Sequence, residues 1–150
     1  MVFIILFRYY LCNFLRKLHK TYSLYIVYKM GLPIITHYEN RNAFFDSLNY
    51  NPGLIIVKFG ADWCGPCKLI EEEVHHHFES MPDTVQCAII DVDKSFDLYA
   101  FMKTKKIVKG IPTILCYYKN NTHYAPDDVF VGSNKLELRD FFKRSLESLA

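Results

Sequence analysis

The sequence predicts an α/β fold in which a mixed sheet is packed between helices. Three observations indicate this class. From residue 31 onward, short β-branched apolar runs alternate with segments of helical periodicity. The run LIIVKFG at 54–60 is apolar at almost every position, which is typical of a central strand covered on both faces. Two strand-like segments near the end of the chain, one that ends at 118 and one at 128–132, are joined by a turn and exposed loop, which favours an antiparallel pair.

The first half of the predicted domain supplies two strands and a helix. A short strand is expected at 32–38, followed by a helix at 40–48 that has Asn40 or Asn42 as its N-cap. The polar segment at 49–53 is a turn and leads into the central strand. The order of elements alternates strand and helix from the start, as expected for parallel crossover connections.

The segment after the central strand is predicted to be one helix that runs from Cys64 to the breaker MPD at 81–83. Ile70, Val74 and Phe78 recur at helical spacing, on a face that Cys67 shares. Pro66 suits the first turn of a helix, where its missing N–H costs nothing. The remaining elements are a strand, a short helix, a loop running into a strand, an edge strand and a final helix, at 85–93, 95–103, 106–118, 128–132 and 134–149.

Composition and charge exclude several classes of function. The 150 residues are 51% hydrophobic and 23% charged, which indicates a folded chain rather than a disordered one. The net charge is +2, but residues 1–30 carry +5 and no acid, so the rest sums to −3. The main body therefore has no basic field for nucleic acid. Five cysteines, with only one close pair, fit a reducing, cytoplasmic compartment rather than a secreted disulfide framework.

Residues 1–30 form a hydrophobic, basic N-terminal extension, and residues 31–150 form the predicted domain. Stretches without Lys or Arg reach only seven or eight residues in the extension, short of the ~20 that span a bilayer. Its basic and apolar parts stand in the reverse order of a signal peptide. We favour an extension that is dispensable for the chemistry, since Met30 directly precedes the globular patterning. A membrane-associated anchor and an organellar targeting segment stay open, as does a viral particle, because the composition fits an AT-rich genome.

The pair Cys64-x-x-Cys67 is compatible with two chemistries. A structural zinc site needs four Cys or His ligands, usually as two spaced pairs, and the sequence has no second C-x-x-C, so no metal is expected. A redox dithiol needs its first cysteine at a helix N-terminus inside a βαβ context, which the patterns supply. Free N–H groups and the positive end of the helix dipole there favour a thiolate, the species that attacks a disulfide.

Three motifs resemble those of the thioredoxin family. WCGPCK, from Trp63 to Lys68, is similar to the family's active-site motif at every position. GIPT at 110–113 resembles its cis-proline loop, and FVG ending in Gly132 resembles its third substrate-facing loop. The resemblance extends over residues 34–149 and implies a thioredoxin-like α/β/α sandwich with a central mixed sheet.

The resemblance implies a thiol–disulfide oxidoreductase that reduces protein disulfides. Cys64 would attack the target and form a mixed disulfide, and Cys67 would resolve it. Trp63 would shield the dithiol and contact the partner. Gly65 and Pro66, between the cysteines, are similar to those of the reducing members of the family rather than the isomerases.

Substrate contacts are implied for two further loops. Pro112, expected to follow a cis peptide bond, would face the cysteines. The backbone of Ile111 would pair with an extended substrate segment, and the loop at Gly132 would contact it.

The same resemblance implies no bound cofactor. The redox centre would be the Cys64–Cys67 disulfide, reduced by an external, flavin-containing, NADPH-dependent reductase. Disulfide-containing proteins and this reductase would be the partners, and nucleic acid would not. Two alternatives stay open: a redox-weak docking module built on the same fold, and an oxidase or isomerase in an oxidising compartment.

Lys58 departs from the family, which has a buried Asp at this position and a Lys where Ile89 falls. A buried lysine is costly unless it finds an acceptor or loses its proton, and Asp91 or Asp93 is the candidate partner. A side chain that snorkels to the surface is the alternative. We hypothesise that Lys58 stabilises a thiolate, which makes the dithiol a weaker reductant and slows proton transfer to the Cys67 sulfur.

Other conspicuous residues favour plain structural interpretations. Side chains of His75–His77 point about 100° apart along a helix, so they are not expected to converge on a metal, and His77 is expected to pack half-buried. Cys87 and Cys116 are expected to be small buried hydrophobes. Gly60 stands where the family commonly has Trp, which leaves the edge of the predicted site less packed.

Overall fold

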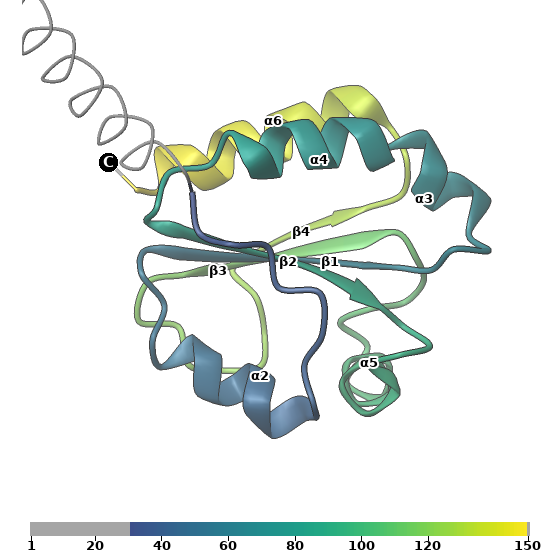
Figure 1. Cartoon of the computed structure of the whole chain (residues 1–150), viewed down its shortest axis with the longest axis horizontal. Helices are drawn as coiled ribbons and strands as arrows, with labels where there is room; N and C mark the ends of the chain where they lie inside the picture. The colour runs from purple at the N-terminus through teal and green to yellow at the C-terminus, as the bar shows by residue number, and fades with distance from the viewer. Residues whose placement is uncertain (1–30, 150) are drawn as a thin grey trace, which may run out of the picture. The chain divides into compact units, whose positions relative to one another are not determined.

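Four strands form one mixed sheet in the computed structural model, which describes residues 31–149 (Figure 1). The strand order is β2-β1-β3-β4, with β1 at Leu54–Gly60, β2 at Val85–Asp91, β3 at Thr113–Tyr118 and β4 at Asp128–Val131. β1 runs parallel to β2 and antiparallel to β3, and β3 runs antiparallel to β4. The predicted mixed sheet is therefore confirmed.

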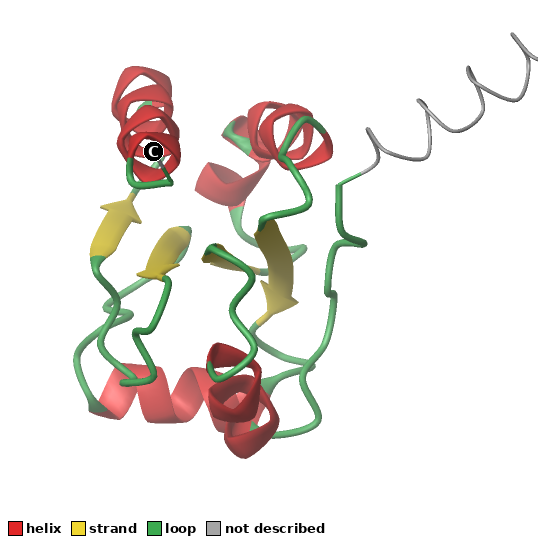
Figure 2. Ribbon diagram, turned by 90° about the vertical axis from the view of Figure 1, so that its left-hand side faces the viewer, coloured by secondary structure: helices red, strands yellow, loops and turns green. Residues whose placement is uncertain are grey.

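Helices cover both faces of this sheet and make the three layers seen in Figures 1 and 2. α2 (Arg41–Leu48) and α5 (Phe96–Thr104) lie on one face, and α4 (Glu71–Glu79) and α6 (Lys135–Glu147) lie on the other. The short α3 (Gly65–Leu69) follows the end of β1. The predicted α/β/α sandwich is confirmed.

β1 is the strand that both hydrophobic cores share. Ile55, Val57 and Phe59 belong to the core beneath α2 and α5, whereas Leu54 and Ile56 belong to the core beneath α4 and α6. Every residue of β1 is buried, as the apolar run predicts. Because side chains alternate along a strand, Lys58 lies on the same side as Leu54 and Ile56. Its neighbours across the sheet are Ile89 on β2 and Ile114 on β3.

The predicted strand at 32–38 is wrong in extent, because only Ile35 pairs with the sheet. The N–H of Ile35 donates to Cys87 O at 3.0 Å, and Ile35 O accepts the N–H of Ile89 at 2.8 Å. Pro33 has no N–H with which to extend this pairing. Tyr38 then turns inward and packs edge-on against Phe44 of α2, with ring centroids 5.3 Å apart.

The single helix predicted from Cys64 to the 81–83 breaker is also wrong, because it is interrupted at Ile70. The Ile70 backbone has φ −109° and ψ 0°, outside the helical region. Its N–H donates to Cys67 O at 3.4 Å, which closes a tight last turn of α3. Ile70 O accepts the N–H of Val74 at 2.9 Å, which begins α4. Three glutamates, Glu71–Glu73, occupy the first turn of α4, where negative charge is favourable.

Asn40, and not Asn42, is the N-cap of α2, because its side chain accepts the N–H of Ala43 at 3.0 Å. Within residues 31–149, no helix combines the length and apolarity needed to cross a bilayer. The predictions made for residues 1–30 fall outside the described part of the chain.

Candidate active site

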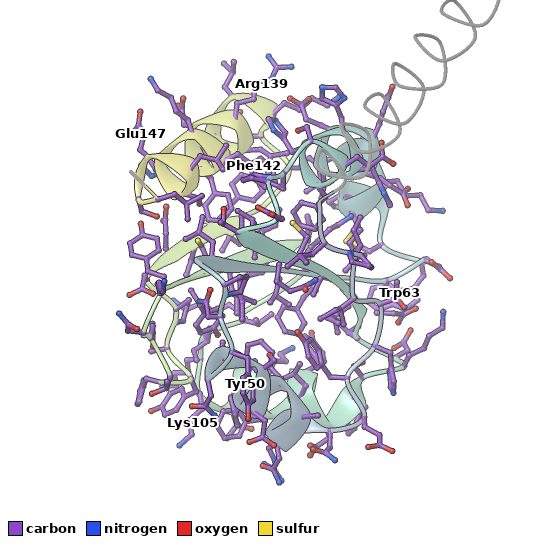
Figure 3. All side chains as sticks on the ribbon, turned by 60° about the vertical axis from the view of Figure 1, so that its left-hand side comes forward. Tyr50, Trp63, Lys105, Arg139, Phe142 and Glu147 are labelled. Carbon is purple, nitrogen blue, oxygen red and sulfur yellow. A yellow bond between two sulfur atoms is a disulfide. The ribbon has the colours of Figure 1, made fainter. Side chains whose placement is uncertain are left out.

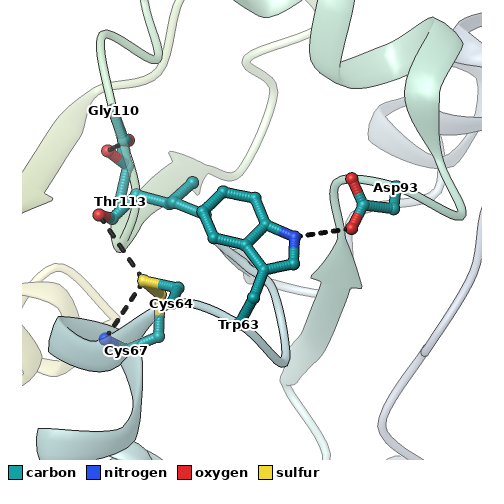
Figure 4. Close-up of a disulfide and its surroundings, with 7 residues drawn as sticks. Trp63, Cys64, Cys67, Asp93, Gly110 and Thr113 are labelled. Carbon is teal, nitrogen blue, oxygen red and sulfur yellow. Dashed lines mark hydrogen bonds between the residues drawn. A yellow bond between two sulfur atoms is a disulfide. The ribbon is translucent and has the colours of Figure 1, made fainter.

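Cys64 and Cys67 form a disulfide at the start of α3, with Cα atoms 5.3 Å apart (Figure 4). Cys64 is the N-cap of this helix, and its Sγ accepts the N–H of Cys67 at 3.2 Å. Pro66 occupies the first turn, where a missing N–H costs no hydrogen bond, as predicted. The local sequence therefore places the first sulfur where the free N–H groups of the helix point.

The cis-proline loop lies against the first cysteine. The Ile111–Pro112 peptide bond is cis, as the sequence predicts, and Ile111 O lies 3.8 Å from Cys64 Sγ. In the disulfide this sulfur has no proton, so the contact is a close approach. A reduced Cys64 thiol has a proton to donate to the same carbonyl.

Two hydrogen bonds fix the shape of this loop. Thr113 Oγ1 donates to Gly110 O at 2.7 Å within the loop (Figure 4). The N–H of Gly132 donates to Pro112 O at 3.0 Å, so the third predicted loop adjoins the second. Gly132 has φ +101°, a conformation that favours glycine. All three motifs singled out in the sequence are thus brought together at one end of the sheet.

Trp63 lies at the surface beside the disulfide, with 68% of its area exposed (Figure 3). Its Nε1 donates to Asp93 Oδ2 at 2.7 Å, which orients the indole (Figure 4). The sequence did not predict this role, because Asp93 was considered there only as a partner for Lys58. The available signal was position: Asp93 follows β2, and the carboxyl ends of parallel neighbours meet at one edge of a sheet.

The two ion pairs expected for Lys58 do not form. Asp93 binds Trp63, and Asp91 pairs with Lys94 at 3.4 Å. Lys58 does not extend over the outer surface either, because only 4% of the residue is exposed, but its side chain lines a half-open pocket. Burial lowers the pKa of the Lys58 ammonium, and the charge of Glu71 partly opposes this shift. Glu71 is solvent-exposed and borders the same cavity as Lys58.

Cys87 and Cys116 are free and buried, as predicted. Burial raises the pKa of each thiol to about 12, so neither is a nucleophile at neutral pH. His77 stacks on Phe142 with ring centroids 4.3 Å apart, which confirms its packing role. Across residues 31–149, no three Cys, His, Asp or Glu side chains gather as a metal site.

This arrangement is suited to one kind of chemistry. Two cysteines at a helix start can exist as a dithiol or as the disulfide observed here, and they exchange between these states by transferring two electrons. A mixed sheet between helices, with the cysteine pair facing a cis-proline loop, defines the class of thiol–disulfide exchange proteins.

Comparison with known proteins establishes the family. The Thioredoxin family model matches residues 35–144, and the chain belongs to the thioredoxin family. It is 38% identical to a thioredoxin of Ophiophagus hannah over 64% of this chain and 83% of that protein. It is 32% identical to a thioredoxin of Equus caballus over 73% of this chain and 97% of that protein.

Solved structures agree with this assignment. The structure of Trichomonas vaginalis thioredoxin superposes with a TM-score of 0.61 at 25% identity, covering 75% of this chain and 96% of that one. Thioredoxin NaTrxh from Nicotiana alata gives 0.57 at 29% identity, covering 77% and 90%. The chain is therefore a thiol–disulfide oxidoreductase of the thioredoxin type that acts on disulfide-containing proteins. Thioredoxins need no bound cofactor, since the cysteine pair is itself the redox couple.

Proposed function

We propose that the chain reduces disulfides of other proteins, with Cys64 as the attacking residue and Cys67 as the resolving residue. The Cys64 thiolate attacks one sulfur of the target, a Cys64–target bond forms, and the other target sulfur leaves and takes up a proton. The Cys67 thiolate then attacks Cys64 Sγ. The internal disulfide forms, and the electron pair of the broken bond leaves with the second target sulfur.

The single observation that carries these roles is the position of Cys64 Sγ as the N-cap acceptor of α3, 3.2 Å from the N–H of Cys67. A backbone N–H that points at this sulfur stabilises a thiolate there. Cys67 is instead only 5% exposed, at the base of a half-open pocket, which suits a group that reacts with Cys64.

The target binds across the surface that surrounds Cys64. Trp63 offers an exposed apolar face, and the carbonyl of Ile111 lies within reach of a segment laid over the sulfur. Pro112 and the loop at Gly132 border the same place, joined by their hydrogen bond. An extended segment of the target pairs with this backbone on either side of its cysteine.

A separate enzyme returns the two electrons. A flavin-containing, NADPH-dependent reductase reduces the Cys64–Cys67 disulfide, and two protons complete the dithiol. We place the chain in the cytoplasm, a location that the odd number of cysteines with only one close pair favours. Residues 1–30 are an extension dispensable for the chemistry, with membrane association or organellar targeting as the other roles for them.

Matched serine variants test the roles. Cys67→Ser, mixed with a disulfide-bonded protein such as insulin, is expected to accumulate a covalent complex visible in intact-mass spectrometry. Cys64→Ser is expected to form none. The reverse result would exchange the two roles. A wild-type chain that fails to turn over insulin with dithiothreitol would instead favour a docking module.

A further inference from the structure

Lys58 is a buried cation that the mechanism above does not use. It stands in the middle of β1 and is only 4% exposed. Within residues 31–149 its ammonium makes no ion pair and no side-chain hydrogen bond, since Asp91 and Asp93 bind other groups. Burying an ammonium without a partner costs free energy, so the groups around the Lys58 amine decide its protonation state.

The end of the Lys58 side chain and the Cys67 sulfur border the same space. A Cβ atom at Gly60 would lie 3.7 Å from Lys58 Cε and 3.5 Å from Cys67 Sγ. Gly60 and Lys58 are two residues apart on one strand, so they face the same side of the sheet. Because position 60 is glycine, no side chain from this position separates the lysine from the resolving sulfur.

This space is part of a cavity of about 560 Å³ that Lys58, Gly60 and Cys67 line together. One water molecule takes about 30 Å³ in the liquid, so the cavity has room for several. Water in it can carry a proton between the amine and the sulfur. The other ionisable groups that line it are His37, Asp62, Lys68, Glu71, Asp91 and Lys94.

Lys58 alone among these groups is buried, and its Cε borders the same point as Cys67 Sγ, so it is the one fitted to exchange a proton with Cys67. Asp91 and Lys94 are paired with each other at 3.4 Å. Burial lowers the pKa of Lys58 from its usual value, with Glu71 opposing, which brings the neutral amine closer to neutral pH. A neutral amine accepts a proton, and the ammonium that results attracts a thiolate.

We propose that Lys58 handles the proton of Cys67 in the resolving step. Through water in the cavity, the amine takes the proton from the Cys67 thiol. The ammonium stabilises the thiolate until it attacks Cys64 Sγ, when the internal disulfide forms and the target sulfur leaves with the electron pair. Lys58 then gives its proton to solvent, and the departing thiolate takes one up. The proposal rests on the roles of Cys64 and Cys67 proposed above.

Release of thionitrobenzoate separates the two chemical steps. In the full chain carrying Cys12→Ser, reduced Cys64 attacks dithiobis(nitrobenzoate) and releases one chromophore. Cys67 then attacks the mixed disulfide and releases the second, so stopped-flow absorbance records one phase for each cysteine. Lys58→Met removes the charge and the proton, and Lys58→Arg keeps a charge that cannot be deprotonated. Lys94→Met is the matched control, a cation at the same cavity that is paired with Asp91.

The second phase is expected to slow about 10²-fold at neutral pH in both Lys58→Met and Lys58→Arg, the lower end of what a positioned acid–base group supplies. The first phase stays close to wild type, and release of only two chromophores shows that the variants fold, because Cys87 and Cys116 are then still buried. Lys94→Met leaves both phases unchanged. In Lys58→Met the second phase should recover as the pH rises, because Cys67 then ionises without help.

Two results would overturn the proposal. One is that the second phase of Lys58→Met is as fast as that of Lys94→Met. The other is that the second phase of Lys58→Arg proceeds at the wild-type rate, since a fixed positive charge would then be enough and no proton transfer by residue 58 would be needed. Absence of the first phase in the wild type would contradict the role of Cys64 instead, so the two failures are distinguishable.

Discussion

Position in the fold gives the cysteines of this chain opposite chemistries. Cys64 caps a helix and accepts a backbone N–H, an environment that favours a thiolate. Cys87 and Cys116 lie on the strands that flank β1, each opposite Ile56, inside the core beneath α4 and α6. Burial without a nearby cation favours the neutral thiol there, so the second pair is inert at neutral pH.

We expect only Cys64 to react quickly with iodoacetamide in the reduced, folded chain at pH 8, in the Cys12→Ser background. Cys87 and Cys116, with pKa values of about 12, keep their protons until the chain unfolds in guanidinium. Peptide mass spectrometry measures the labelling. Fast labelling of Cys87 or Cys116 in the folded chain would contradict the burial argument.

The same two thiols make stability depend on alkaline pH. An unfolded thiol ionises near pH 8.5, whereas the folded ones hold their protons to about 12, so the folded state binds more protons between these values. Stability is therefore expected to fall as the pH rises through this window. Urea unfolding of wild type and Cys87→Ala at pH 7 and pH 10 checks this: the variant should lose less stability than the wild type.

Among the elements, helix ends decide how the domain is connected. α3 ends and α4 begins at Ile70, a fully buried residue whose backbone leaves the helical region. Because of this break, Cys67 belongs to a short helix of its own, while Glu71 opens the next one. α2 starts at a side-chain cap instead, where the oxygen of Asn40 satisfies a free N–H.

Asn40→Ala is expected to lower the free energy of unfolding by about 1 kcal/mol, because it removes this cap. Asn42→Ala is the matched control: it is exposed inside the same helix, where alanine has the higher helix propensity. Urea unfolding followed by circular dichroism measures both. Equal losses in the two variants would show that the cap bond does not stabilise α2.

At the scale of the whole molecule, two cores on opposite faces of one sheet stabilise the fold. The core beneath α2 and α5 includes Phe44, Phe59 and Tyr117, and the core beneath α4 and α6 includes Phe141 and Phe142. Within residues 31–149, these clusters join the sheet to the helices on both of its faces. The domain thus contains its own source of hydrophobic stabilisation.

A chain that begins at Met30 is therefore expected to fold and to turn over insulin at the full-length rate. Its melting temperature should lie within about 4 °C of the full chain, the shift that 1 kcal/mol produces at this size. Calorimetry and an insulin turnover assay provide the measurements. Sedimentation of both chains with anionic vesicles tests membrane association, which only the full chain would show. Loss of turnover on truncation would contradict a dispensable extension.

Much of the fold was predictable because it depends on local sequence patterns. The four strands, α2, α5 and α6 follow from hydrophobic periodicity and turn residues, and each was expected close to its observed position. The strand expected at 32–38 failed for a non-local reason: one residue pairs with β2, and the chain then turns to bury Tyr38. Local β-propensity does not determine how many residues of this segment pair with β2.

The sequence by itself determined the reaction class, because C-x-x-C, its helix start and the cis-proline motif are all short-range features. Only the tertiary structure decided the partners: Asp93 binds Trp63, and Lys58 shares a cavity with Cys67 across Gly60. These contacts join segments that are distant along the chain or on different elements. Burial and charge depend on which segments meet, so the acid–base setting of the site follows from packing.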